Sequence, residues 1–231
     1  MTRLSPWHWA KRIGFGLFLF SWAWYGMLNR TGSLTAFCFL MSTVAIIGAW
    51  EIVKLSNEIS LFQRASALGI WCLLVASTVG LRLENPLLLL LAIYAGAGYD
   101  TCALAIGQLF DPRHLHPLFP TLSQRKTLAA TVGGIHGGWL CAWSFQLAWL
   151  PEWSFGWSML AIMPCPFLAF LGDLAPSVAK KRLGLRHSGE TLPRWAQVFG
   201  SHGGALDRCL SILLPVIWIA LVTSLRKISL P

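Results

Sequence analysis

The chain has 231 residues, of which 55% are hydrophobic and only 12% are charged, and its formal net charge is +9. A soluble domain of this length would carry roughly twice that charged fraction, so the composition excludes an ordinary soluble protein and indicates an integral membrane protein. The basic residues lie in short loops, where membrane topology and anionic lipid headgroups explain them better than nucleic-acid binding does.

A helix needs about 20 mostly apolar residues to cross the hydrocarbon core of a bilayer. We therefore predict an all-α fold, a polytopic helix bundle with about seven transmembrane helices that forms one membrane domain over residues 1–231. The N-terminal spans occupy 13–82, and the polar residues of interest concentrate in 86–225. The predicted spans are 13–29, 34–53, 66–82, 86–109, 127–149, 155–175 and 206–225.

The basic residues are distributed unevenly between the two ends of the predicted spans. If the N-terminus is cytosolic, every Lys and Arg except Arg30, Arg82, Arg226 and Lys227 lies on the cytosolic side, which is the arrangement that the positive-inside rule favours. We expect the first span to be a retained helix, because no small-residue cleavage site follows it. This orientation places the candidate functional residues near the cytosolic membrane surface.

The first two acidic residues within the predicted spans are Glu51 and Asp100. Glu51 ends the second span, and we expect a structural or supporting role for it, paired with Lys54 or a loop cation. Asp100 lies inside the fourth span, where an ionised carboxylate costs about 2.5–3.5 kcal/mol. We favour a metal-binding or substrate-orienting role for Asp100, and pairing with a buried Lys or Arg is the alternative. Gly96 and Gly98 allow another helix to approach closely.

The sequence SQRKT directly precedes the fifth span. Hydroxyl groups and cations at a helix N-terminus form a site for phosphate, so Ser123, Arg125, Lys126 and Thr127 are candidate phosphate ligands. Positive-inside charge alone is the alternative explanation. The sequence HGG at 136–138, inside the fifth span, predicts close helix packing instead of a ligand site.

The segment from Gly172 to Arg208 joins two strongly apolar spans, is rich in basic residues and has an aspartate near each end. A divalent cation such as Mg²⁺ prefers carboxylate oxygens and substrate phosphates, so we predict that Asp173 and Asp207 bind the metal. The alternative for Asp207 is that it caps the following helix. The candidate phosphate contacts near the two aspartates are Ser177, Lys180, Lys181, His202, Gly203, Gly204 and Arg208.

In their order along the chain, these motifs resemble the CTP:phosphatidate cytidylyltransferase (CDP-diacylglycerol synthase) family, and the chain looks like a divergent, short member. The resemblance covers about residues 45–225. Two acidic residues of the family pattern are replaced, by Ala129 and His187. The matching elements are Ala49-Trp50-Glu51, Asp100-Thr101, Gly107 to Phe110, Ser123 to Thr127, Gly172-Asp173-Leu174, Ser177 to Lys181, Leu192-Pro193, His202-Gly203-Gly204 and Asp207-Arg208.

The resemblance implies a nucleotidyltransferase of phospholipid biosynthesis in the bacterial plasma membrane, with its active site facing the cytosol. It would transfer CMP from CTP to phosphatidate, giving CDP-diacylglycerol and pyrophosphate. Mg²⁺ is the implied cofactor, and a second, monovalent cation and a homodimer are left open. The implied catalytic residues are Asp100, Lys126, Lys180, Lys181, His202 and Arg208; the substrate-binding residues are Ser123, Arg125, Thr127, Ser177, Gly203 and Gly204; the metal ligands are Asp173 and Asp207.

Two other functions stay open at this point. One is a CTP-dependent lipid-alcohol kinase of the polyprenol type, which would use the same nucleotide but transfer its γ-phosphate. The other is a catalytically degenerate membrane transport or interaction protein, which the two replaced acidic residues suggest.

Overall fold

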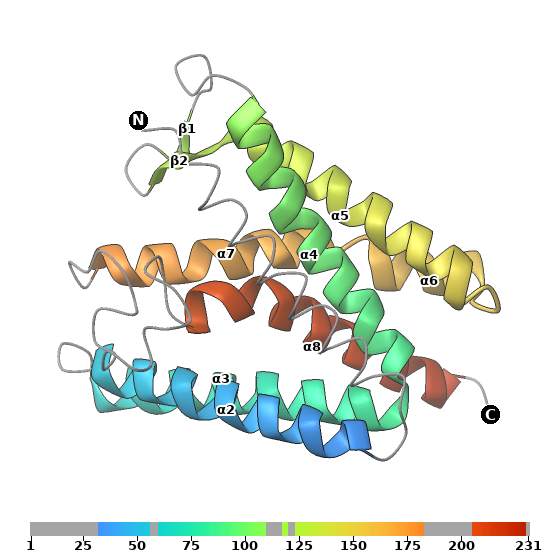
Figure 1. The fold of residues 1–231 in the computed structure, drawn as a ribbon, viewed down its shortest axis with the longest axis horizontal. Helices are drawn as coiled ribbons and strands as arrows, with labels where there is room; N and C mark the ends of the chain where they lie inside the picture. The colour runs from blue at the N-terminus through green and yellow to red at the C-terminus, as the bar shows by residue number, and fades with distance from the viewer. Residues whose placement is uncertain (1–31, 56–59, 110–116, 120–122, 183–204, 230–231) are drawn as a thin grey trace. The chain divides into compact units, whose positions relative to one another are not determined.

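Helices account for nearly all of the chain that the computed structural model describes, which comprises residues 32–55, 60–109, 117–119, 123–182 and 205–229. The all-α prediction is confirmed, with the addition of one short antiparallel pair of strands (Figure 1). The elements are α2 (Gly32–Leu55), α3 (Leu61–Glu84), α4 (Pro86–Leu109), β1 (Pro117–Phe119), β2 (Ser123–Thr127), α5 (Leu128–Trp149), α6 (Phe155–Ile162), α7 (Cys165–Arg182) and α8 (Ala205–Ser229).

The described helices fit a membrane protein by their length and composition. Within the described residues, four helical segments are long and apolar enough to cross a bilayer, and a shorter apolar helix covers Phe37–Val53. The number of seven spans stays a prediction, because 13–29 lies outside the described residues and α5 is not among the four segments. The four segments are Leu61–Glu84, Pro86–Leu109, Phe155–Ala179 and Cys209–Ile228.

The span predicted at 155–175 consists of two helices, because a turn at Met163 and Pro164 separates α6 from α7. Pro164 and Pro166 lie two residues apart, and proline has no backbone N–H to donate within a helix. The break is narrow: the N–H of Leu168 already donates to the Pro164 carbonyl oxygen, at 3.0 Å. The chain therefore continues in α7 as far as Arg182, beyond the predicted end.

Local signals set the boundaries of α3 and α4. Ser60 and Gln63 form a capping box, in which each side chain accepts a hydrogen bond from the backbone N–H of the other. At the other end of α3, the backbone N–H of Asn85 donates to the Leu81 carbonyl oxygen. The side-chain oxygen of Asn85 accepts a hydrogen bond from the backbone N–H of Leu87, at 2.9 Å. Pro86 then occupies the first position of α4, where its missing N–H has no consequence.

Glycines allow α4 and α5 to lie side by side (Figure 1). A Cβ atom on Gly98 would lie 2.8 Å from the Cβ of Cys141, and one on Gly138 would lie 2.8 Å from the Ala95 carbonyl oxygen. Both distances are shorter than a van der Waals contact, so a larger residue would force the helices apart. The packing role predicted for the HGG sequence at 136–138 is thereby confirmed.

Helix α8 contacts α3, α4 and α7. Gly96 of α4 meets the backbone of Ser211 and Ile212, and Gly172 of α7 meets the backbone of Leu210 and Ser211. Two glycines from two helices therefore converge on the same part of α8, and they bring α4 and α7 together around Ser211.

By its contacts, the chain divides into two compact units, Met1–Thr43 and Val44–Pro231. The single membrane domain over 1–231 stays a prediction. All contacts discussed below lie within the second unit.

Candidate functional site

An ion pair connects two of the predicted motifs. Lys126, in strand β2, donates from Nζ to both Oδ2 and the backbone oxygen of Asp173 in α7, at 2.6 Å each. The Lys126 side chain is only 15% exposed and that of Asp173 is 39% exposed. An ion pair that is partly shielded from water is stronger than one on the surface. The structure thus brings a candidate phosphate ligand and a candidate metal ligand into direct contact.

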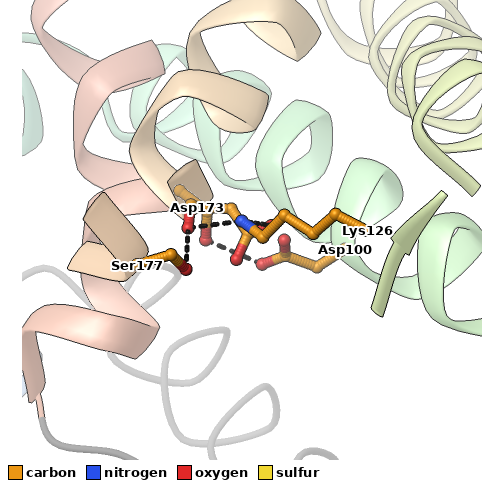
Figure 2. A network of polar contacts seen from close by, with 5 residues as sticks. Asp100, Lys126, Asp173 and Ser177 are labelled. Atoms are coloured by element: carbon orange, nitrogen blue, oxygen red, sulfur yellow. Dashed lines mark hydrogen bonds and ion pairs between the residues drawn. The ribbon is translucent and has the colours of Figure 1, made fainter. Parts of the chain in front are cut away.

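Asp100 of α4 belongs to the same polar site. Its Oδ2 atom accepts a hydrogen bond of 2.7 Å from the hydroxyl of Ser211 in α8, and the charges of Asp173 and Lys126 both act on its carboxylate. Figure 2 shows the Asp100 carboxylate beside the Lys126–Asp173 pair. Asp100 thus lies near a lysine and also near a second carboxylate, and its role in metal binding, substrate orientation or ion pairing stays a prediction.

Helix α7 supplies a further hydroxyl group to this cluster. Ser177 lies one turn after Asp173, and its hydroxyl donates to the Asp173 backbone oxygen at 3.3 Å (Figure 2). Gly172 allows α7 to pack closely against the backbone of Leu210 and Ser211 in α8, since any side chain at 172 would overlap the Leu210 carbonyl group. We refer to Asp100, Lys126, Asp173, Ser177 and Ser211 as the aspartate cluster.

Sequence reasoning missed two residues at this site, Ser211 and Tyr99. Tyr99 is 3% exposed, and the charges of Asp173 and Asp100 act on its hydroxyl group. Ser211 could have been found, because it lies four residues after Asp207 and so follows it by about one helical turn. Nothing in the pattern marks Tyr99, since the residue adjacent to Asp100 in a helix would be expected to point elsewhere.

Some of the predicted phosphate ligands lie next to the cluster. Thr127 follows Lys126 and caps α5, where its hydroxyl oxygen accepts a hydrogen bond of 3.3 Å from the N–H of Ala130. The backbones of Ser123 and Arg125 lie in β2. Substrate binding by these three residues stays a prediction.

The remaining predicted residues lie on either side of residues 183–204 or among them. Lys180 and Lys181 lie near the C-terminal end of α7, where the Lys181 side chain is exposed. Asp207 and Arg208 lie in the first turn of α8, so the backbone at 207 is about one turn from Ser211. His202, Gly203 and Gly204 lie outside the described residues.

The donor atoms of the aspartate cluster are suited to a hard cation. They are two carboxylates, two hydroxyl groups and a backbone carbonyl, which are the oxygen ligands that Mg²⁺ and Ca²⁺ bind. Among the described side chains, no group of three His, Cys, Asp or Glu residues converges. Asp100 and Asp173 alone would therefore supply two ligands, and a complete site would need Asp207 or substrate oxygens.

Comparison with known proteins identifies one family. The model of the cytidylyltransferase family matches residues 67–225. The chain is 32% identical over 131 residues to a phosphatidate cytidylyltransferase of Staphylococcus aureus (strain COL), a match that covers 54% of this chain and 45% of the relative. It is 33% identical over 129 residues to the phosphatidate cytidylyltransferase of Staphylococcus saprophyticus, covering 53% and 44%. The match thus spans less than half the length of these relatives.

Proposed function

Because the chain belongs to the cytidylyltransferase family, we propose that it transfers CMP from CTP to phosphatidate and releases pyrophosphate. One structural observation carries the proposal: Lys126, Asp173 and Asp100, from three different elements, form one polar site in a helix bundle with a mainly apolar core. A site of this kind is expensive to bury and is typical of a membrane protein that handles a charged ligand. The buried polar site and the family membership therefore both favour a function that involves a charged substrate.

The proposed reaction is a displacement at phosphorus. A phosphate oxygen of phosphatidate attacks the α-phosphorus of CTP, a new P–O bond forms, and the bond between the α-phosphorus and the bridging oxygen breaks as pyrophosphate leaves. The second pKa of a phosphate monoester is about 6, so the attacking oxygen is largely ionised at neutral pH and needs no strong base. The main barrier is the approach of two anions, which positioning and opposite charge lower.

Among the described side chains, Lys126 is a cation that would lower that barrier. Its ammonium group is held by Asp173 through two hydrogen bonds, which leaves one of its three N–H donors available for a substrate phosphate. We assign the same neutralising role to Lys180, Lys181 and Arg208. The hydrogen-bond donors to phosphate would be Ser123, Arg125, Thr127, Ser177, His202, Gly203 and Gly204.

We propose that Asp173 and Asp207 hold Mg²⁺, with Asp100 supporting the same site. The carboxylate and hydroxyl oxygens of the aspartate cluster support this assignment. When bound, Mg²⁺ would neutralise phosphate charge and orient the triphosphate.

We propose that the site opens to the cytosol, where CTP is present. Phosphatidate would enter the site sideways from the membrane, between helices.

The test is an assay of purified protein in phosphatidate-containing vesicles with Mg²⁺ and CTP labelled at the α-phosphate. Label should appear in the lipid product, and pyrophosphate should form in equal amount. A parallel assay with γ-labelled CTP and vesicles that contain a polyprenol tests the alternative, since label in the lipid product there would identify a lipid-alcohol kinase. Absence of both products from correctly folded protein would refute an enzymatic function with these substrates.

A further inference from the structure

Glu51 of α2 is fully buried, at 0% exposure, and its carboxylate contacts the beginning of another helix. Its Oε2 atom accepts a hydrogen bond of 3.0 Å from the backbone N–H of Leu206, the second residue of α8. The first four N–H groups of a helix lack partners within the helix, and the helix dipole favours a carboxylate beside them. Glu51 therefore caps α8 from a position 155 residues earlier in the chain.

The capped turn of α8 is the one that carries Asp207 and Arg208. One turn further along, Ser211 donates its hydrogen bond to Asp100 of α4. The beginning of α8 is thus held by two carboxylates that come from two other helices. Because hydrogen bonds tolerate little change in distance or angle, the two contacts together restrict both the position and the rotation of this helix end.

The C-terminal half of α2, which carries Glu51, is hydrogen-bonded to α3. Trp71 of α3 donates from its indole N–H to the Ala45 backbone oxygen in α2, at 3.0 Å. An unpaired carboxylate in such apolar surroundings would be costly, so the contact with α8 matters for Glu51 as well as for the helix. The buried cluster around this contact consists of Ile52, Trp71, Leu74, Leu206 and Leu213.

We propose that Glu51 is a positioning residue of the site: by capping α8, it sets where the backbone at Asp207 lies and so how tightly the site binds a divalent cation. This inference rests on the proposed function, in which Asp207 is a metal ligand. It gives Glu51 a role beyond stability, because loss of its carboxylate should weaken cation binding at the site as well as loosen the beginning of α8.

The experiment uses two variants of Glu51 and one control. Glu51→Leu removes the acceptor at similar volume, and Glu51→Gln keeps an acceptor but removes the charge. The control is Glu84→Gln, whose carboxylate is 45% exposed and pairs with Lys227 at 2.9 Å, away from the aspartate cluster. Mn²⁺ binding to the full-length proteins without substrate is titrated by electron paramagnetic resonance. Hydrogen exchange of the first turn of α8 is measured on the same samples.

Glu51→Leu should weaken Mn²⁺ binding about tenfold and accelerate exchange in the first turn of α8. Glu51→Gln should weaken binding by about threefold, since it retains the hydrogen bond, and Glu84→Gln should leave both readouts unchanged. If Glu51→Leu does not fold, the Mn²⁺ affinity of Glu51→Gln tests the proposal, provided that the melting temperature of this variant matches that of the wild type.

Unchanged Mn²⁺ binding in the folded Glu51 variants would overturn the proposal even if exchange became faster, because Glu51 would then only stabilise the helix. A wild-type protein that binds no Mn²⁺ would overturn it too. A wild-type protein that binds Mn²⁺ but forms no CDP-lipid would refute the proposed function. The role of Glu51 would then be decided by the Mn²⁺ affinity of the Glu51 variants relative to that of the wild type.

Discussion

The Nζ atom of Lys126 lies 2.6 Å from both the side-chain Oδ2 and the backbone oxygen of Asp173, although the two residues are 47 positions apart. This contact joins strand β2, which leads into α5, to the middle of α7. It also joins the two sequence motifs that we assign to phosphate and metal binding. The pair is therefore the natural starting point for testing the site.

We expect Lys126→Met and Asp173→Asn each to lower CDP-lipid formation by at least about 100-fold, because each removes a charge that the phosphates or the cation require. Combined, they should cost less stability than the sum of the two single changes, with a coupling of about 1–3 kcal/mol. Thermal unfolding of the four proteins in detergent measures the coupling. Glu152→Gln, an exposed change in the turn after α5, is the control for activity. Strictly additive stability effects would show that the ion pair does not form.

Ser211→Ala should lower activity by about tenfold and stability by about 1–2 kcal/mol, since the Asp100 carboxylate loses the hydrogen bond that Ser211 donates at 2.7 Å. Ser224→Ala is a matched control on the same helix, because the Ser224 hydroxyl donates only to the Ala220 oxygen of its own helix. Steady-state kinetics and melting temperatures are compared for both variants. Equal behaviour of the two variants would contradict a functional link between Ser211 and Asp100.

Gly172→Ala should destabilise the protein by about 1–3 kcal/mol, because the new methyl group would overlap the Leu210 carbonyl group in α8. The change should also lower activity, since Asp173 is the next residue and α7 would have to move away from α8. Gly80→Ala in α3 is the control, where nothing lies within 4 Å of the added atom and helix propensity favours alanine by about 1 kcal/mol. Equal stability and activity of Gly172→Ala and Gly80→Ala would contradict the claim that Gly172 is needed for the close packing of α7 against α8.

Removal of divalent cations should abolish CDP-lipid formation, because Mg²⁺ is expected to neutralise the charge on the phosphates of both substrates. Treatment with EDTA followed by graded addition of Mg²⁺ gives the concentration for half-maximal activity. That concentration should be higher in Asp100→Asn than in the wild type, by about tenfold. Full activity in EDTA would show that lysine and arginine residues alone neutralise the phosphates.

A good part of the molecule can be predicted from the sequence. Charged residues are costly in a bilayer, so the few that interrupt apolar stretches, such as Asp100, mark a polar site before any fold is known. Apolar length predicts α3, α4, α5 and α8, and a single span where the structure has α6 and α7; the small residues at 136–138 predict close packing. The sequence does not predict the strand pair β1–β2, because SQRKT directly precedes a helix and carries no clear alternation of apolar and polar residues.

The amino-acid sequence by itself determined the class of the protein, its main helices and the candidate residues Asp100, Lys126 and Asp173, because these follow from local hydropathy and the cost of buried charge. Only the tertiary structure decided which of these residues meet, and it added Ser211 beside Asp100 and Glu51 at the start of α8. Those contacts join residues 111 and 155 positions apart. They depend on how each helix is rotated against its neighbours, and a periodic pattern within one helix carries no information about that rotation.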